Sequence, residues 1–427
     1  MNIIKYPSRE EWKTLLSRPH RDAAELAATV QTVLDKVRME GDAAVKEYEE
    51  LFDHVKLDTL AVSQAEIDEA VAMVSPELMG AIQLAHDNIY TFHASQKFTG
   101  EKVEVAPGVV CWQKSVPIER VGLYIPGGTA PLFSTVLMLA TPAKIAGCRE
   151  IVLCTPPDGE GKVNPAILAA AKIAGVSRIF KAGGVQAIGA MAYGTESVLK
   201  VDKIFGPGNQ FVMAAKQQVS LHDAAIDMPA GPSEVAVVAD DTANPVFVAA
   251  DILSQAEHGR DSQVILITTS EAMAKCVNEE VHRQLELLPR KDLASASLQY
   301  SKLIIVHNVD EAVDMTNEYA PEHLILAVDS YLAFAERVVN AGSVFLGNYS
   351  CESAGDYASG TNHTLPTSGY AKAYSGVNLD SFCRKITFQE LTPQGVRTIG
   401  PAVELMAAAE QLDAHKNAMT VRLSSLS

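Results

Sequence analysis

The chain has 427 residues, of which 48% are hydrophobic and 20% are charged, so it can bury more than one core without help from disulfides. Its formal net charge of −17 would repel phosphate backbones, and no cluster of Lys and Arg stands out against that charge. We therefore expect no nucleic acid partner, whereas a small cationic substrate is compatible with the charge.

Amphipathic helices are predicted in the first hundred residues. In residues 23–52 and 64–98, apolar side chains recur at spacings of three and four among charged and polar ones. The tripeptide at residues 75–77, Ser-Pro-Glu, has the pattern of an N-cap followed by proline at the first helical position, so the second stretch is predicted to form two helices. Turn-rich sequence with β-branched residues follows in residues 103–118.

Two runs of short apolar strands, separated by helix-like segments, come next. The strands of the first run are predicted at residues 121–126, 150–156, 178–183 and 201–206, and those of the second at 233–240, 263–269, 302–308 and 323–329. Strands rich in Val and Ile that alternate with helical crossovers indicate parallel βαβ units. The predicted fold class is therefore α/β, with two similar doubly wound modules that meet near residues 229–232, where turn-forming residues concentrate.

The pattern changes after residue 342. Residues 347–376 are polar and rich in Gly, Ser and Thr, and a compact domain rarely carries so long a loop without a functional reason. Residues 385–391 are predicted to form a strand, and residues 401–422 a helical tail.

The sequence also bears on the cellular location. The first residues show no basic stretch followed by an apolar core, and the apolar run at residues 136–140 is soon interrupted by Pro142, so we expect neither an export signal nor a membrane span. The six cysteines are scattered, without a Cys-x-x-Cys pair, which favours a reducing cytoplasm.

Two pairs of residues are the first candidates for chemistry. Gln255 and His258 lie three apart at the end of a predicted helix, so both could face one metal ion, although such a pair is more often part of an ordinary polar surface. Glu322 and His323 stand at the mouth of a predicted strand, where burial could tune both groups for acid–base catalysis. An exposed ion pair is the alternative for these two residues.

Two further pairs are weaker candidates. Asp356 and His363, in the glycine-rich loop, offer an oxygen and an imidazole ligand, although an aspartate in such a loop is more often a turn former. Glu410 and His415 lie five apart in the tail, which is not a same-face helical spacing, so solvent exposure is the default for each.

A dinucleotide fingerprint is missing. No Gly-x-Gly-x-x-Gly opens the first βα unit, and the segment at residues 206–209 lacks the third glycine. Residues 126–128 and 206–209 each precede a predicted helix, so their backbone amides could receive a pyrophosphate, and either segment could equally be a tight turn.

Longer segments resemble those of histidinol dehydrogenases and follow in that family's order from about residue 115 to 390. They are IPGGTAPLFSTVLMLATPAKIAGC, AGGVQAIGAMAYGTESV, DKIFGPGNQFV, DMPAGPSEV, SQAEHG, NEYAPEHL and SAGDYASGTNHTLPTSG. The helical tail with Glu410 and His415 extends the resemblance.

The resemblance implies a function and a set of site residues. It implies a zinc-dependent, NAD-linked oxidation of L-histidinol through its aldehyde to L-histidine, in a homodimer with shared active sites. The implied zinc ligands are Gln255, His258, Asp356 and, from the partner subunit, His415. Glu322 and His323 are the implied acid–base pair; Tyr124, Gln186 and Asn209 are the implied NAD contacts; and Ser233, Gln255, His258, His323, Asp356, Glu410 and His415 are the implied substrate contacts.

The resemblance also implies a domain organisation. Both modules are expected to be incomplete Rossmann-like folds, and the C-terminal helical tail is expected to be exchanged across the dimer. We expect an N-terminal segment at residues 1–22, a discontinuous α/β domain at 23–120 with 233–377 that carries the zinc and acid–base residues, an inserted NAD-binding domain at 121–232, and a dimer-exchange tail at 378–427.

Three other functions remain open at this stage. The same fold could oxidise another small alcohol, such as a sulfonated diol, although the presence of Glu410 and His415 favours histidinol. A zinc hydrolase could use Glu322 or His323 to activate metal-bound water without a redox cofactor. A non-catalytic metal-binding or scaffold protein would need none of the chemistry of that pair.

Overall fold

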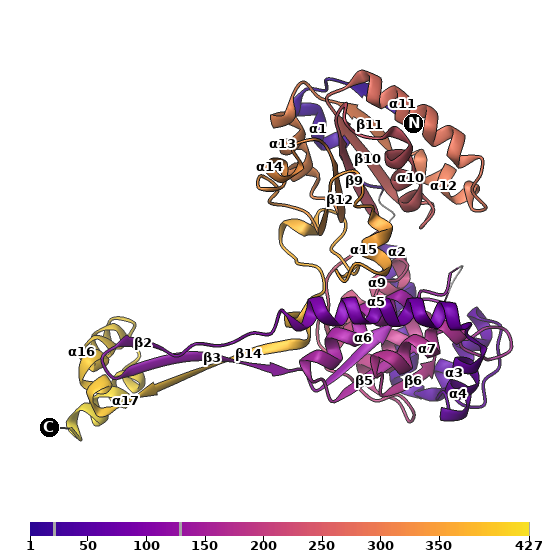
Figure 1. Cartoon of the computed structure of the whole chain (residues 1–427). Helices are drawn as coiled ribbons and strands as arrows, with labels where there is room; N and C mark the ends of the chain where they lie inside the picture. The colour runs from indigo at the N-terminus through magenta and orange to yellow at the C-terminus, as the bar shows by residue number, and fades with distance from the viewer. Residues whose placement is uncertain (20–22, 128–129, 427) are drawn as a thin grey trace.

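The computed structural model describes residues 1–19, 23–127 and 130–426, which form two α/β lobes and a long arm (Figure 1). Parallel sheets dominate both lobes, so the predicted α/β class is confirmed. In the described parts of the chain, no helix is long and apolar enough to cross a bilayer.

The upper lobe in Figure 1 is built on a six-stranded parallel sheet with the order β1-β11-β10-β9-β12-β13. Its strands are β1 (Asn2–Lys5), β9 (Glu234–Ala239), β10 (Gln263–Thr268), β11 (Lys302–Ile305), β12 (His323–Ala327) and β13 (Ser343–Leu346). Its helices are α1 (Arg9–Leu15), α10 (Pro245–Ala256), α11 (Glu271–Leu285), α12 (Lys291–Leu298), α13 (Val309–Tyr319), α14 (Tyr331–Ala335) and α15 (Glu352–Tyr357). Apolar clusters cover both faces of the sheet, which explains why its central strands are continuous runs of Val, Ile, Leu and Ala.

The lower lobe contains a five-stranded parallel sheet with the order β6-β5-β4-β7-β8. Its strands are β4 (Arg120–Tyr124), β5 (Glu150–Thr155), β6 (Arg178–Lys181), β7 (Lys203–Phe205) and β8 (Ala225–Ile226). Its helices are α2 (Ala23–Glu40), α3 (Asp42–Phe52), α4 (Gln64–Met73), α5 (Pro76–Ala94), α6 (Phe133–Ala146), α7 (Pro165–Ala174), α8 (Gly184–Tyr193) and α9 (Gln210–Val219). Counted along the chain, strands β4 to β8 have the same spatial order as strands β9 to β13 of the upper lobe.

The packing of the first hundred residues differs from the expected domain grouping. Helices α2 and α3 pack on α8 and α9, while α4 and α5 pack on α6 and α7, so residues 23–94 cover the sheet of residues 120–226 instead of joining residues 233–377. The N-terminal segment does join the upper sheet, because β1 pairs with β11. Amphipathic periodicity shows that a helix has an apolar face but not which sheet covers it, which is why the grouping could not be foreseen.

The arm is an antiparallel sheet that ends in two helices, at the left of Figure 1. It consists of β2 (Val103–Ala106), β3 (Val109–Pro117) and β14 (Cys383–Leu391), followed by α16 (Pro393–Ala409) and α17 (Asp413–Ser424). Two short 3-10 helices, η1 (Tyr370–Lys372) and η2 (Leu379–Phe382), precede β14. The tail therefore has two helices and begins earlier than the predicted single helix at residues 401–422, because Thr392 caps α16 and Pro401 is accommodated inside it.

Candidate active site

The expected acid–base pair lies at the amino end of the upper sheet. His323 is the first residue of β12, and Glu322 precedes it directly. The neighbouring strand β9 starts beside them, since His323 lies opposite Val235 in the parallel register. In many α/β proteins the site lies at the carboxyl ends of the strands, so the location here is unusual. Figure 1 shows α15 and the chain around it on this side of the sheet, facing the lower lobe.

Glu322 and His323 are both buried, with 5% and 4% of their surface exposed, so the alternative of an exposed ion pair is excluded. His323 Nδ1 lies 3.7 Å from Glu322 Oε2 and 3.8 Å from Glu352 Oε1, and Nε2 lies 3.6 Å from Asp356 Oδ1. These separations are longer than hydrogen bonds. The imidazole therefore lies within ion-pair distance of three carboxyl groups without a hydrogen bond to any of them.

The surroundings perturb both groups. Burial raises the pKa of Glu322 to about 7, against the opposing influence of the neighbouring imidazole. Burial would lower the pKa of His323, but the negative charges of Glu352, Glu322 and Asp356 outweigh it and raise that pKa to about 10. Two adjacent titratable groups with shifted proton affinities are typical of a catalytic site.

A group of possible metal ligands lies beside the pair. One ligand atom each from His258, Glu352 and Asp356 falls within 4.8 Å of the others. Gln255 is fully buried on α10, which packs against α15, the helix that carries Glu352 and Asp356. Within the described residues, both side-chain polar atoms of Gln255, both carboxyl oxygens of Glu352 and Asp356 Oδ1 have no hydrogen-bond partner.

Such unpartnered buried groups require an explanation, because leaving them unpaired is costly. Nitrogen and oxygen ligands from a histidine, carboxylates and an amide suit a divalent cation such as zinc. The residues present therefore fit a metal. The structure brings together two of the four expected ligands, His258 and Asp356, and packs α10, which carries the buried Gln255, against α15.

Glu352 is the residue that the sequence analysis missed. Burial raises its pKa to about 8. It lies four residues before Asp356 on α15, so the two carboxyl groups share one helical face. That spacing was the available signal, but the helix is only six residues long and lies within a segment predicted to be a loop.

His363 has a different role from that of a ligand. Its Nδ1 lies 2.9 Å from the backbone oxygen of Asp356, and its Nε2 lies 3.0 Å from Thr135 Oγ1 on α6. Both ring nitrogens are therefore occupied. Asn362 donates a hydrogen bond of 2.6 Å to the backbone oxygen of Met138, also on α6. The polar loop thus fastens the lower lobe next to the acid–base pair.

The remaining expected ligand does not reach this cluster within one chain. His415 is exposed on α17, and Glu410 is exposed at the end of α16, both at the tip of the arm. Figure 1 shows these helices at the far end of the arm from α15. A contribution of either residue to a site of this kind would have to come from another copy of the chain.

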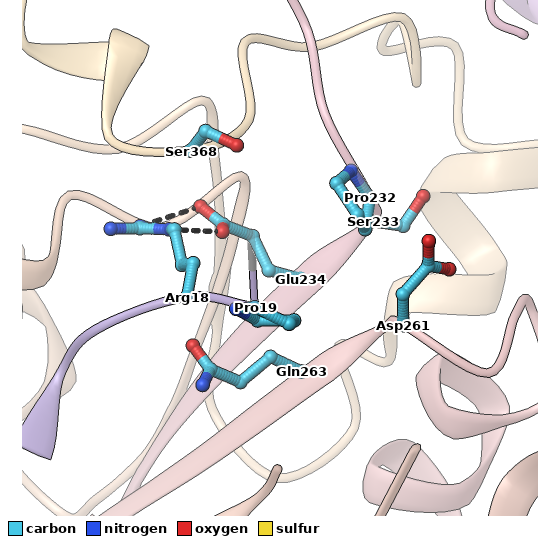
Figure 2. Close-up of a pocket in the computed structure, with 8 residues that line it drawn as sticks. All are labelled: Arg18, Pro19, Pro232, Ser233, Glu234, Asp261, Gln263 and Ser368. Carbon is cyan, nitrogen blue, oxygen red and sulfur yellow. Dashed lines mark hydrogen bonds and ion pairs between the residues drawn. The ribbon is translucent and has the colours of Figure 1, made fainter. Parts of the chain in front are cut away.

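Ser233, an expected substrate contact, lines a small cavity at the amino ends of β9 and β10 (Figure 2). The other lining residues are Arg18, Pro19, Pro232, Glu234, Asp261, Gln263 and Ser368. The cavity volume is about 10 Å³, which is room for about one water molecule. The cavity itself is therefore too small for an amino alcohol.

The expected NAD contacts gather at the carboxyl ends of strands in the lower sheet. Tyr124 ends β4, Asn209 follows β7 and caps α9, and Gln186 lies in the first turn of α8 after β6. Strands β4 and β7 are neighbours whose connections run to opposite sides, which is where open α/β sheets bind ligands.

These three residues differ in accessibility. Asn209 is exposed, and its side-chain oxygen accepts hydrogen bonds from the amides of residues 211 and 212. Tyr124 and Gln186 are buried, with 4% and 1% of their surface exposed. The Tyr124 hydroxyl accepts a hydrogen bond of 3.1 Å from the Gly184 amide. Gln186 Nε2 donates a hydrogen bond of 2.9 Å to the buried Glu49. Of the other segment considered for a pyrophosphate, residues 126–128, Gly128 lies outside the described residues.

Two lobes with parallel sheets, and a buried histidine–carboxylate cluster where they meet, define an α/β protein with a candidate metal-assisted acid–base site. The family model described as histidinol dehydrogenase matches residues 16–423. The histidinol dehydrogenase of Bacteroides thetaiotaomicron is 69% identical over 426 residues, 100% of both chains, and that of Yersinia pestis is 52% identical over 422 residues, 98% of this chain and 94% of the relative.

A solved structure agrees with these matches. The crystal structure of histidinol dehydrogenase from Elizabethkingia anophelis has a TM-score of 0.98 and 56% identity, covering 100% of this chain and 98% of that one. The chain belongs to the histidinol dehydrogenase family. The expected family, and with it the expected class of oxidoreductase, are confirmed.

Proposed function

We propose that the protein is a zinc-dependent enzyme that oxidises L-histidinol through L-histidinal to L-histidine in two successive NAD-linked steps. One observation carries the proposal: the buried pair Glu322–His323 lies directly beside the unpartnered carboxyl oxygens of Glu352 and Asp356. A hydrolase or a scaffold protein would not explain the family membership.

Zinc would be held by Gln255, His258 and Asp356, with His415 of a second subunit completing the set. When bound, zinc supplies a positive charge that fixes the imidazole and amino groups of the substrate. Ser233 and Glu410 are proposed as further substrate contacts, Glu410 again from the second subunit. Holding the substrate in one orientation at a fixed acid–base pair reduces the entropic part of the barrier.

His323 would remove the hydroxyl proton of the alcohol as the hydride leaves the adjacent carbon. NAD, when bound, is the acceptor of that hydride. For this role His323 must be neutral at the start of the step. Two of the carboxylates that raise its pKa, Glu352 and Asp356, belong to the group of possible metal ligands, so a divalent cation bound there would lower that pKa toward neutrality.

Glu322 would serve the second oxidation. The aldehyde carbon must first gain a water oxygen, and the Glu322 carboxylate would take one proton of that water as the carbon–oxygen bond forms. His323, protonated in the first oxidation, would give that proton to the aldehyde oxygen as the hydrate forms, and would then remove a hydroxyl proton from the hydrate as a second hydride leaves. The balance is one histidinol, one water and two NAD consumed, with histidine, two NADH and protons formed.

The NAD site would lie between the carboxyl ends of β4 and β7, with Tyr124, Gln186 and Asn209 as contacts. The equal strand order of the two sheets supports the interpretation of both lobes as incomplete Rossmann-like modules. Asn209 is accessible in the described chain, and the Tyr124 hydroxyl retains a proton to donate.

A homodimer with exchanged arms would complete each site. The arm bears exposed apolar side chains, including Leu405, Met406 and Val421, which a monomer would leave in water. The free cysteines fit the cytoplasmic location that we also propose.

The test is to incubate the purified, zinc-loaded protein with L-histidinol and excess NAD and to follow NADH absorbance and histidine together. We expect about two NADH per histidine, with activity lost on chelation and restored by zinc. The absence of NADH formation with histidinol, together with turnover of a different alcohol, would refute the substrate assignment; hydrolysis of an ester or amide without NADH formation would refute the redox function.

A further inference from the structure

Arg18 connects the N-terminal segment to the start of the upper sheet. Its Nε donates a hydrogen bond of 2.5 Å to Glu234 Oε2, and its Nη2 donates one of 2.7 Å to Glu234 Oε1, a paired arrangement drawn with dashed lines in Figure 2. The exposed fractions of the two side chains are 16% and 2%. A two-pronged, nearly buried guanidinium–carboxylate pair is rigid, unlike a pair on the surface.

Arg18 also contacts the segment that leads into β12. Its Nη2 donates a second hydrogen bond, of 2.6 Å, to the backbone oxygen of Tyr319, and its guanidinium carbon lies 4.2 Å from the centre of the Tyr319 ring. Tyr319 is the last residue of α13, three positions before Glu322. One side chain thus holds the beginning of β9 and the approach to β12 at the same time.

Glu234 in turn contacts the expected base of the second oxidation. The backbone N–H of Glu234 donates a hydrogen bond of 3.0 Å to Glu322 Oε2. Among the described residues, no other group donates a hydrogen bond to the Glu322 carboxyl group, so its orientation depends on where the first residue of β9 lies.

We propose that Arg18 is a positioning residue for Glu322: by clamping Glu234 and Tyr319, it places the Glu234 amide that orients the Glu322 carboxyl group. This inference rests on the role of Glu322 in the proposed function. It gives the first 19 residues a part in catalysis, although they contribute no expected site residue. The adjoining cavity of about 10 Å³ is too small to hold a substrate. The contacts of Arg18 therefore position Glu322 and do not bind a ligand in that cavity.

Arg18 also supplies the positive charge that compensates the Glu234 carboxylate next to Glu322. The charged and titratable groups facing Glu322 are His323 on β12, Glu234 on β9, Glu352 and Asp356 on α15, and Tyr319 on α13. Without Arg18, the Glu234 carboxylate would be buried beside Glu322 with no counter-charge. Glu322 would then lose its proton only at higher pH, and the positioning of its carboxyl group would loosen.

The experiment compares the two half-reactions in zinc-loaded enzyme, with L-histidinol and L-histidinal as separate substrates. We expect Arg18→Met to lower kcat for aldehyde oxidation about tenfold or more, because a small displacement of a base is costly. Alcohol oxidation should stay within about twofold, since His323 keeps its surroundings. The acid limb of the pH–rate profile for aldehyde oxidation should move to higher pH.

Two matched variants separate positioning from general stability. Arg18→Met/Glu234→Gln removes both charges and should return the acid limb to its original pH, which a merely structural role would not predict. Arg9→Met removes an exposed ion pair with Asp314 in the same segment and should change neither half-reaction. If Arg18→Met does not fold, the double variant and Arg18→Lys, which keeps the charge but not the two-pronged contact, carry the same comparison.

Glu322→Gln distinguishes the two possible failures. If it slows aldehyde oxidation selectively while Arg18→Met slows both half-reactions equally or neither, the positioning role is overturned and the role of Glu322 stands. If Glu322→Gln shows no selectivity, the assignment of Glu322 as the base is overturned, and the inference falls with it.

Discussion

Lys216→Met removes the positive charge of a buried ion pair beneath the proposed NAD site. Lys216 Nζ lies 2.5 Å from Asp227 Oδ1, and the side chains are 1% and 2% exposed. Lys216 also donates a hydrogen bond of 2.8 Å to the Gly206 backbone oxygen, while Asp227 accepts hydrogen bonds from the amides of Gly206 and Met228. The pair therefore anchors the segment that leads to Asn209.

The loss of stability in Lys216→Met depends on the buried Asp227 carboxylate that remains without a positive partner. Asp227 would keep its two backbone donors but lose its counter-charge, and breaking a buried pair in this way costs about 3–5 kcal/mol. Lys216→Met/Asp227→Asn also removes the orphaned charge, so the remaining loss should be about 1–3 kcal/mol, from the unpaired Gly206 oxygen and from the backbone N–H that faces the Asn NH2 group instead of a carboxyl oxygen. Lys172→Met, which breaks an ion pair whose side chains are 49% and 57% exposed, should cost at most about 1 kcal/mol.

Urea unfolding of the three variants and the parent protein, followed by circular dichroism and tryptophan fluorescence, measures the free energies of unfolding. Lys216→Met should also raise the KM for NAD, because the residues before Asn209 lose an anchor. A loss for Lys216→Met no greater than that of Lys172→Met, or a double variant no more stable than the single one, would refute the reasoning.

Three further predictions concern the site. Glu322 must be a carboxylate to act as a base and its pKa is about 7, so aldehyde oxidation should slow as the pH falls below that value. Glu322→Gln should slow aldehyde oxidation about 10²-fold or more in single-turnover measurements. A rate of aldehyde oxidation that does not change with pH would contradict this role. Inactive His258→Asn and His415→Asn chains, refolded together, should regain about one quarter of the parent activity if each site takes residues from two chains, and none if the sites are not shared. Gly206→Ala should lower the free energy of unfolding by about 1–3 kcal/mol, because Gly206 has φ +125° and a Cβ there would lie 2.1 Å from the backbone oxygen that ends β4. Gly159→Ala, where a Cβ meets nothing within 4 Å, is the control. Equal melting temperatures for the two variants would contradict the argument.

Local patterns in the sequence predicted most of the elements. Runs of Val and Ile closed by Gly or Pro correspond to strands β4 to β7 and β9 to β12 of the parallel sheets, whereas β1, β8 and β13 were not predicted. The Ser75-Pro76 signal marks the start of α5. These features depend on neighbours in the chain, so they can be read without knowing the tertiary contacts.

Contacts between distant segments could not be predicted in the same way. The arm pairs Val109 with Leu391 and Pro117 with Cys383, and neither partner sequence specifies the other. At the site, the sequence alone identified Glu322 and His323 as adjacent groups suited to acid–base catalysis. It did not show that their side chains are buried. Glu352 became a candidate only when α15 brought it beside His323.

The pairing of β1 with β11 has a consequence for how the protein is made. Asn2 lies opposite Lys302, and the amino group of Met1 donates a hydrogen bond of 2.9 Å to Asn278 Oδ1. During synthesis β1 has no partner until about three hundred more residues have been translated, whereas the five-stranded sheet of the lower lobe is complete by residue 226. Strand β1 is thus among the last to join the sheet in which it lies, so the upper lobe is completed only after most of the chain has been translated, and blocking the Met1 amino group would remove its contact with Asn278.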